Sequence, residues 1–197
     1  MKTKTQKLSL AAILTALAVA LSFAKIWEMP LGGSVTLGSM LPVMLVSLTL
    51  GVKWGLASGG VFAAFQLVQA LIGGNVFPYC ETGWTLTICV LFDYVFPFSL
   101  LGLAGAFRGM SIGRFRHAGA YLGIVLVCLL RFVAHFVTGV AIWGQWAPEG
   151  MGKYLYSLLY NGGYMLPELG ISLLLAVLIL ETRALRPFLS LPTEEKR

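Results

Sequence analysis

Five polar residues lie within apolar segments of this sequence or at their ends: Asp93, Arg131, His135, Asn161 and Glu168. A charge in hydrocarbon costs roughly 2.5–3.5 kcal/mol even on the lenient insertion scale, so such a residue normally faces a partner or a polar cavity. Aromatic residues accompany them along the chain: Trp84, Tyr94, Trp143, Trp146, Tyr156, Tyr160 and Tyr164. An acid, an imidazole, an amide and aromatic faces together suit a small, flat, cationic or heteroaromatic ligand.

The composition predicts an integral membrane protein. Of 197 residues, 58% are hydrophobic and 11% are charged, and the mean hydropathy is +0.85, whereas a soluble domain carries about 25% charged residues. The net charge of +6 comes mostly from residues that flank apolar segments. We therefore interpret the basic residues as a signal of membrane topology, and we expect no nucleic acid partner.

Six apolar segments are separated by charged or turn-rich breaks, and they predict six transmembrane helices in one domain, 1–197. Their approximate ranges are 8–26, 37–51, 54–73, 84–107, 118–142 and 155–182, followed by a polar tail, 183–197. The first segment is long enough to span a bilayer, so we expect a retained helix rather than a cleaved signal peptide. The second segment is short for a hydrocarbon core of about 30 Å.

Lysine and arginine residues predict that both termini are cytoplasmic. With that orientation, eleven basic residues lie inside and two, Lys25 and Lys153, flank the outer side. The inner set is Lys2, Lys4, Lys7, Lys53, Arg108, Arg114, Arg116, Arg183, Arg186, Lys196 and Arg197. The loops 28–36, 74–83 and 143–154 are then external.

Motifs of catalysis and metal binding are absent from the sequence. There is no P-loop, H-E-x-x-H, G-x-S-x-G or dinucleotide fingerprint, so we expect neither an enzyme nor an energy source within this chain. The three cysteines, Cys80, Cys89 and Cys128, have no C-x-x-C spacing. Because two of them lie in apolar segments, we expect no disulfide framework, no metal site and no cofactor.

Two predicted helices carry an acid or a base at membrane depth. Asp93 lies four residues before Pro97, which cannot donate to the Asp93 carbonyl, so the helix should kink there. Arg131 and His135 are spaced i, i+4 and share one helix face, which predicts a pocket wall. The alternatives are an acid neutralised by protonation or by Arg131, and a histidine that is simply satisfied in the core.

The last segment carries an aromatic stripe, Tyr156, Tyr160 and Tyr164, that ends at Glu168. Such a stripe alone usually indicates packing. Asn161 lies beside it and must find hydrogen bonds, which favours a ligand face that includes Tyr164. Gly162, Gly163 and Pro167 weaken the helix there, and irregular backbone at membrane depth is tolerated where it lines a cavity.

Small residues recur every four positions in the first segment, at Ala12, Ala16, Ala20 and Ala24. Such a groove lets another helix approach closely. The pattern alone leaves open whether this helix belongs to the same chain or to a separate subunit.

Several of these segments resemble the thiamine-specific substrate-binding (S) component of energy-coupling factor (ECF) transporters. The resemblance is carried by 131–136 (RFVAHF), 143–145 (WGQ), 156–168 (YSLLYNGGYMLPE), Asp93-Tyr94 and the alanine stripe, and it spans about 8–182. It implies a six-helix S-component fold with a thiamine site near the outer surface, closed by the loop between the first two helices. It also implies a partner module of one transmembrane coupling protein and two ATPases, in a prokaryotic plasma membrane.

The resemblance implies a substrate pocket made by Asp93, Tyr94, His135, Trp143, Tyr156 and Asn161. Asp93 stands where the family often has Glu, which keeps the charge and shortens the side chain by one methylene. Trp27 is the nearest candidate for the tryptophan of the outer loop. The alanine stripe, Ala12 to Ala24, would dock the partner module.

Two other functions fit the same residues. The first is a stand-alone secondary carrier, proton-coupled through Asp93 and His135, for thiamine or a related small heteroaromatic cation. The second is a membrane scaffold whose buried polar groups only fix the register of the helices. Uptake without an ATPase module separates the first from an ECF component, and ligand binding excludes the second.

Overall fold

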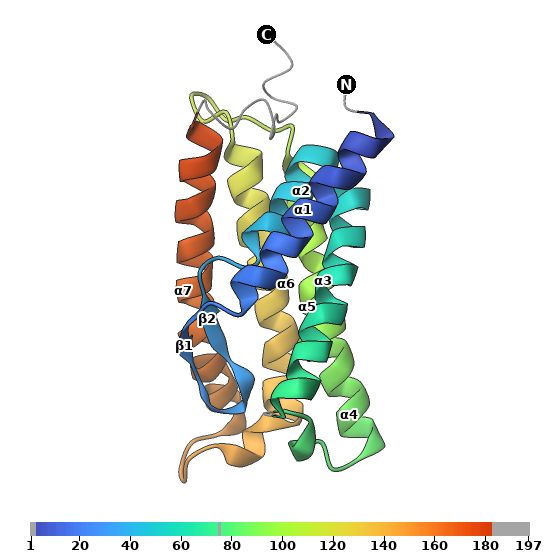
Figure 1. Cartoon of the computed structure of the whole chain (residues 1–197). Coiled ribbons are helices and arrows are strands. Elements are labelled where there is room, and N and C mark those ends of the chain that lie inside the picture. The colour runs from blue at the N-terminus through green and yellow to red at the C-terminus, as the bar shows by residue number, and fades with distance from the viewer. Residues whose placement is uncertain (1–2, 75, 183–197) are drawn as a thin grey trace.

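The computed structural model describes residues 3–74 and 76–182, which form a bundle of helices with one short hairpin (Figure 1). The α-helices are α1 (Lys4–Ser22), α2 (Leu41–Leu50), α3 (Val52–Gly73), α4 (Gly83–Cys89), α5 (Phe96–Ser99), α6 (Ala118–Ala141) and α7 (Lys153–Glu181). The hairpin consists of β1 (Lys25–Glu28) and β2 (Ser34–Thr36). Short helical turns complete the chain: η1 (Pro30–Gly32), η2 (Phe77–Tyr79), η3 (Val90–Val95), η4 (Leu100–Phe107) and η5 (Trp143–Trp146).

Five helical segments in the described part of the chain are long and apolar enough to cross a membrane. They are Lys4–Ser22, Val52–Gly73, Gly83–Phe107, Ala118–Ala141 and Lys153–Glu181. The sixth predicted segment, 37–51, forms the ten-residue helix α2, which at 1.5 Å per residue is about 15 Å long. The all-α membrane fold is confirmed, and α2 is a helix inside the bundle that is shorter than expected.

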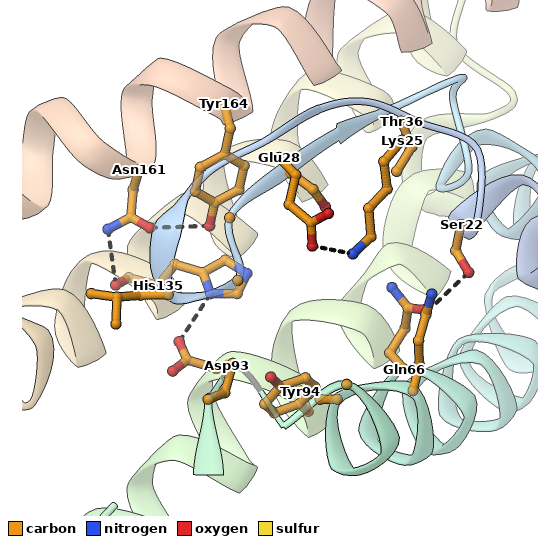
Figure 2. A pocket seen from close by; sticks show the side chains of 18 of the residues that line it. Ser22, Lys25, Glu28, Thr36, Gln66, Asp93, Tyr94, His135, Asn161 and Tyr164 are labelled. Carbon is orange, nitrogen blue, oxygen red and sulfur yellow. Dashed lines mark hydrogen bonds and ion pairs between the residues drawn. The ribbon is translucent and has the colours of Figure 1, made fainter. Parts of the chain in front are cut away.

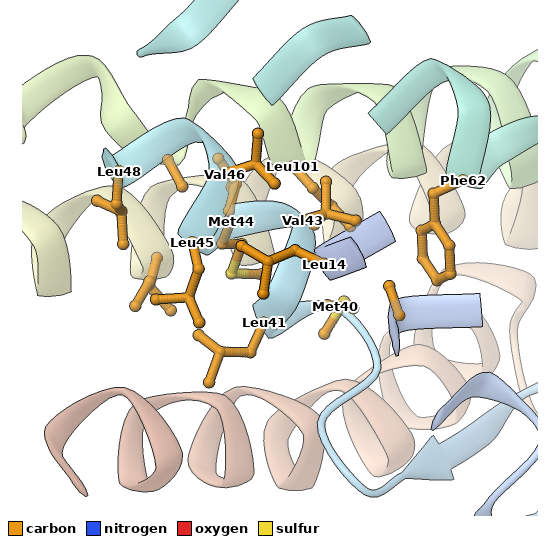
Figure 3. Packing of buried hydrophobic residues seen from close by; sticks show 14 of the residues in the cluster. Leu14, Met40, Leu41, Val43, Met44, Leu45, Val46, Leu48, Phe62 and Leu101 are labelled. Atoms are coloured by element: carbon orange, nitrogen blue, oxygen red, sulfur yellow. The ribbon is translucent and has the colours of Figure 1, made fainter. Parts of the chain in front are cut away.

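Helix α2 forms the centre of the apolar core. Its residues from Leu41 to Leu48 are all buried, and it packs against α1, α3, η4 and α7. A helix that is hydrophobic on every face must be covered on every face, which explains why this short segment is surrounded by the longer helices. Figure 3 shows its side chains, among them Met44 and Val46, with Leu14, Phe62 and Leu101 of neighbouring elements.

The first helix ends at Ser22, earlier than the predicted end near residue 26. Residues 25–28 instead pair with 34–36 as an antiparallel hairpin, with Trp27 opposite Val35 and Glu28 opposite Ser34. The sequence had predicted only a loop here. The turn is made possible by Pro30 and by Gly32, whose φ is +95°. In Figure 1 the hairpin lies beside α7.

The segment around Asp93 is irregular, as Pro97 predicts. Regular helix α4 gives way to the π-helical turn η3, in which the Phe96 N–H donates to the Leu91 carbonyl five residues earlier. The α-helical turn α5, which contains Pro97, and the 3-10 helix η4 follow. Prolines and π-turns are the usual causes of a local break in a long helix, and here they reorient the side chain of Asp93.

Small residues bring η4 and its neighbours into backbone contact. A Cβ atom at Gly119 or Gly123 of α6 would collide with the carbonyl oxygen of Phe107 or Ala104. On the other side of η4, the Gly105 N–H donates to Ser47 Oγ of α2 at 2.9 Å. Close approach through glycine is the common way to pack membrane helices tightly.

The start of α1 and the end of α7 lie at the same end of the bundle (Figure 1). The described basic residues of the predicted inner set belong to elements and loops at that end: Lys4, Lys7, Lys53, Arg108, Arg114 and Arg116. The positive-inside rule predicts that this end faces the cytoplasm. The predicted polar tail, 183–197, lies outside the described residues.

We predict that Gly123→Ala lowers the free energy of unfolding by about 1–3 kcal/mol, the usual cost of overpacking a tight contact. The matched control is Gly60→Ala in α3, because no atom lies within 4 Å of a Cβ at Gly60. The thermal midpoints of the detergent-purified variants would be compared. Equal midpoints for the two variants would contradict the close α6–η4 contact.

Candidate functional site

A cavity of about 150 Å³ opens between the hairpin, α3, η3, α6 and α7, in the half of the bundle away from the chain ends. Figure 2 shows polar side chains pointing into it from opposite walls. Asp93, His135, Asn161 and Tyr164 form one group, and Ser22, Lys25, Glu28 and Gln66 form another. Tyr94 lies along the floor between them in this view.

The carboxylate of Asp93 has three hydrogen-bond donors. His135 Nδ1 and Trp143 Nε1 each lie 3.0 Å from one of its oxygens, and the Thr138 hydroxyl also donates to it. The Asp93 side chain is nearly buried, with 9% of the residue exposed. Donors on both oxygens offset the cost of removing a carboxylate from water.

A chain of contacts links Asp93 to Arg131 through the ring of His135. Arg131 Nε donates to His135 Nε2 at 3.3 Å, and the guanidinium lies 4.7 Å from the centre of the Phe98 ring. Because the Asp93 carboxylate accepts and the guanidinium only donates, His135 must carry its proton on Nδ1 and none on Nε2. Its neutral ring thus bridges one buried negative and one buried positive charge.

Asn161 is held in a single orientation on the same wall. Its amide nitrogen donates to the carbonyl oxygens of Ser157 at 2.9 Å and His135 at 3.2 Å. Its amide oxygen accepts from the Tyr164 hydroxyl at 3.0 Å. This network determines which terminal atom of the amide is the nitrogen and which is the oxygen. It also links α7 to α6 at the depth of Asp93.

The hairpin supplies an ion pair that sequence reasoning missed. Lys25 Nζ lies 2.6 Å from Glu28 Oε1, and both residues line the cavity, as do Gln66 and Gln69 of α3. The hairpin itself was not expected: Lys25 had been placed near the end of the first predicted helix, 8–26, and Glu28 in the predicted loop 28–36. Gln66 and Gln69 were detectable, since two amides spaced i, i+3 share one face of an otherwise apolar helix.

Six of the eight predicted substrate-binding residues line the cavity: Asp93, Tyr94, His135, Trp143, Asn161 and Tyr164. The other two, Tyr156 and Trp27, are not among the described lining residues. Tyr156 packs behind Trp143, with its ring 5.8 Å from that of Tyr160. Trp27 lies on β1 and is 51% exposed.

Arg131, which the sequence placed with His135 on a predicted pocket wall, and Glu168, which it placed at the end of the aromatic stripe, have different surroundings. Arg131 lines the cavity. Glu168 is 1% exposed and accepts a hydrogen bond from the Thr36 hydroxyl at 2.7 Å and another from the Thr36 N–H. Its carboxylate therefore contacts the base of the hairpin. Among the residues that the structure describes, no group of His, Cys, Asp or Glu is suited to hold a metal ion.

The model of the family described as thiamine transporter protein (Thia_YuaJ) matches residues 8–187 of the sequence. The chain belongs to the thiamine transporter family. A relative from Bacillus subtilis (strain 168), described as thiamine transporter ThiT, is 33% identical over 180 residues, which is 87% of this chain and 88% of the relative. A ThiT from Lacticaseibacillus paracasei is 28% identical over 133 residues, 63% of this chain and 62% of the relative.

The fold of this thiamine transporter family member matches a solved structure, ThiT from Listeria monocytogenes. The TM-score is 0.69 at 22% sequence identity, and the match covers 90% of this chain and 94% of the other. The resemblance inferred from the sequence is thus confirmed at the level of the family, and the transporter family agrees with the expectation that the chain is not an enzyme. The chain is a multi-pass protein of the bacterial cell membrane.

The predicted docking residues of this family member differ in exposure. Ala12, Ala16 and Ala20 are exposed on α1, whereas the buried face of that helix contains Ala11, Leu14, Thr15, Ala18 and Ser22. Ala24 is half-buried and lies beyond the end of α1. Three of the four alanines therefore do not pack inside the chain.

We predict that His135 is the neutral tautomer with its proton on Nδ1. The chain contains two histidines, so nitrogen-15 NMR of histidine-labelled protein, with His117→Gln to assign the signals, can test this. One protonated and one unprotonated nitrogen are expected, with the proton on Nδ1. A proton on Nε2, or on both nitrogens, would contradict the Asp93–His135–Arg131 chain of contacts.

Proposed function

We propose that this chain is the high-affinity thiamine-binding subunit of an ATP-driven ECF-type uptake transporter. The observation that carries the proposal is the Asp93 carboxylate, which lines a cavity together with the aromatic residues Tyr94, Trp143 and Tyr164. Both curated relatives are described as thiamine transporters, and thiamine is a permanent cation with two flat heteroaromatic rings.

The charge of the site supports a cationic ligand. A cation over a tryptophan or tyrosine face gains about 0.5–2 kcal/mol, and more when both are dry. A unit charge 4 Å from a carboxylate gains about 4 kcal/mol at an effective dielectric constant of 20. Asp93 is fixed by three donors before any ligand arrives, so it need not reorganise to meet the thiazolium.

The polar groups around the cavity support recognition of the aminopyrimidine. Asn161 and Tyr164 lie beside His135 and can meet donors and acceptors on a ring edge. Asn161 is already oriented by Ser157 and Tyr164. A rigid polar wall of this kind rejects ligands that lack the matching groups, because its own buried groups would then stay unpaired.

The coupling to ATP is inferred from two features of the chain. No nucleotide-binding motif occurs in the sequence, so ATP-driven uptake needs ATPases from outside it. Two of the exposed alanines of α1, Ala12 and Ala16, border an apolar groove against Trp54 and Phe65 of α3, a surface suited to close approach by a partner helix. The proton-coupled carrier is the alternative, and it would transport thiamine without any ATPase.

We predict that thiamine binds to the detergent-purified protein and quenches its tryptophan fluorescence, because Trp143 is the one tryptophan among the described residues that line the cavity. Asp93→Asn should bind thiamine about ten- to a hundredfold more weakly, since a buried hydrogen-bond partner contributes about 1–3 kcal/mol and a charged one more. Titration calorimetry measures both constants, and Asn161→Ala should also weaken binding.

The control for the charge is a neutral thiamine analogue that lacks the thiazolium. The wild type should discriminate strongly against it, and Asp93→Asn should discriminate little. Thermal midpoints are measured in parallel, because the new amide of Asp93→Asn would point an NH₂ at the Trp143 N–H. No calorimetric or fluorescence signal from the wild type would exclude the thiamine assignment. If the wild type and Asp93→Asn discriminate equally between thiamine and the neutral analogue, the role of Asp93 is structural.

We predict that Ala16→Trp abolishes ATP-dependent thiamine uptake while leaving thiamine binding intact, because Ala16 is exposed and lies six residues, about 9 Å along the helix, from Ser22, the α1 residue that lines the cavity. The matched control is Leu17→Trp, which lies about 100° further around the helix at another exposed position. Uptake is measured in cells with and without the ATPase module. Uptake by the wild type in cells that lack the ATPases would support the secondary carrier instead.

A further inference from the structure

Two side chains of α7 hold the hairpin of β1 and β2 against the bundle. Tyr160 contacts the turn of the hairpin, where its hydroxyl accepts from the Gly33 N–H at 3.0 Å and donates to the Pro30 carbonyl. Glu168 contacts the other end, at Thr36. The two residues are eight positions apart, about 12 Å along the helix axis, so they hold opposite ends of the same strap.

The contact between Glu168 and Thr36 is costly to break. Both residues are buried, Glu168 at 1% and Thr36 at 5% exposure. One carboxylate oxygen accepts both the N–H and the hydroxyl of Thr36, and the Thr36 hydroxyl also contacts Ser39 at the start of the turn into α2. The other oxygen, Oε2, has no hydrogen-bond partner in the described part of the chain. Removing Thr36 would leave the whole carboxylate unpaired in the interior, which is costly.

The hydrogen bonds of Tyr160 to the hairpin turn cost less to break. They join a neutral hydroxyl to two backbone groups, the carbonyl of the exposed Pro30 and the N–H of the buried Gly33. When the turn moves away, water can satisfy all three groups, so the net cost of losing these hydrogen bonds is small. The fit is close but separable: a Cβ at Gly33 would lie 2.8 Å from the Tyr160 hydroxyl and 3.0 Å from the Tyr164 ring.

The segment between these two contacts covers the cavity. Lys25, Glu28, Gly33 and Thr36 of the hairpin all line it, and so does Tyr160. If the strap is fixed at Thr36 and opens at its turn, the cavity opens on the side of Pro30 and Gly33. The movement breaks no hydrogen bond of Asp93 or its donors in the described residues, although it separates Leu31 of the turn from the apolar cluster that contains Trp143.

We propose that Tyr160 is the releasable latch and Glu168 the permanent anchor of this strap, and that release of Tyr160 sets how fast the ligand enters and leaves. Both are positioning residues. The proposal rests on the thiamine site for its ligand, but the latch can also be measured without any ligand. Because its hydrogen bonds join atoms of the chain itself, their loss should speed opening of the empty and the loaded protein alike.

The first test is the kinetics of thiamine binding to Tyr160→Phe, followed by stopped-flow tryptophan fluorescence. Loss of the hydroxyl should raise the association and dissociation rate constants together, each by about three- to tenfold, the range expected for one or two neutral hydrogen bonds, and change Kd less than either rate. Tyr154→Phe is the matched control, since Tyr154 is on α7 but 63% exposed, and it should change neither rate. Faster dissociation alone, with a weaker Kd, would make Tyr160 a ligand contact and overturn the latch; unchanged rates would also overturn it.

The second test is amide hydrogen exchange of residues 28–36 in the protein without thiamine. Tyr160→Phe should speed exchange at Gly33 and leave Thr36 protected. Glu168→Leu should expose Thr36, and Glu168→Gln, which keeps an acceptor oxygen, should restore its protection. Should Glu168→Leu fail to fold, Thr36→Val removes only the hydroxyl and should speed exchange at residue 36. If the wild-type protein binds no thiamine, the proposed function fails, while this exchange pattern still tests the strap. Uniform exchange across 28–36 in Tyr160→Phe would overturn the assignment of Tyr160 as latch and Glu168 as anchor.

Discussion

A carboxylate inside a helix bundle needs hydrogen-bond donors for both of its oxygens, and Asp93 obtains them from α6 and from the turn η5. His135 and Thr138 come from the helix, and Trp143 comes from the turn that follows it. This requirement fixes the rotation of α6, the position of η5 and the tautomer of His135. The same requirement keeps an aromatic ring and a negative charge next to each other at the wall of the cavity, which is what a heteroaromatic cation needs.

The break in the fourth membrane segment is the reason that Asp93 can reach these donors. A regular helix through residues 83–107 would lack one hydrogen bond at Pro97, and the chain absorbs this defect as a π-helical turn that carries Asp93. Beyond the break, η4 continues as a tight 3-10 helix, and small residues let its backbone contact α2 on one side and α6 on another. Irregular backbone therefore builds the site, and close backbone packing beneath it makes the site rigid.

The hairpin joins the rigid bundle to the entrance of the cavity. Its base is tied to a buried carboxylate, and its turn is tied to one tyrosine hydroxyl. Because its base is held by a buried carboxylate and its turn by one neutral hydroxyl, we expect the hairpin to move at the turn while the base stays in place. Lys25 and Glu28 line the cavity and belong to the hairpin. Movement of the hairpin would therefore move these two charges as it opens the cavity.

The sequence alone determined the membrane class, the apolar segments, the family and most of the residues around the cavity, because hydropathy, charge and residue type are local properties. Asp93, His135 and Asn161 were identifiable since polar groups are costly in hydrocarbon wherever they stand. Only the tertiary structure decided how they pair: Asp93 meets Trp143 across 50 residues, and Thr36 meets Glu168 across 132. It also decided that α2 has only ten residues, that residues 25–36 form a hairpin, and that Trp27 lies outside the described lining of the cavity. Strands of three and four residues leave too little periodicity to detect, and the two side chains of α7 that contact the hairpin are more than 120 residues away in the sequence.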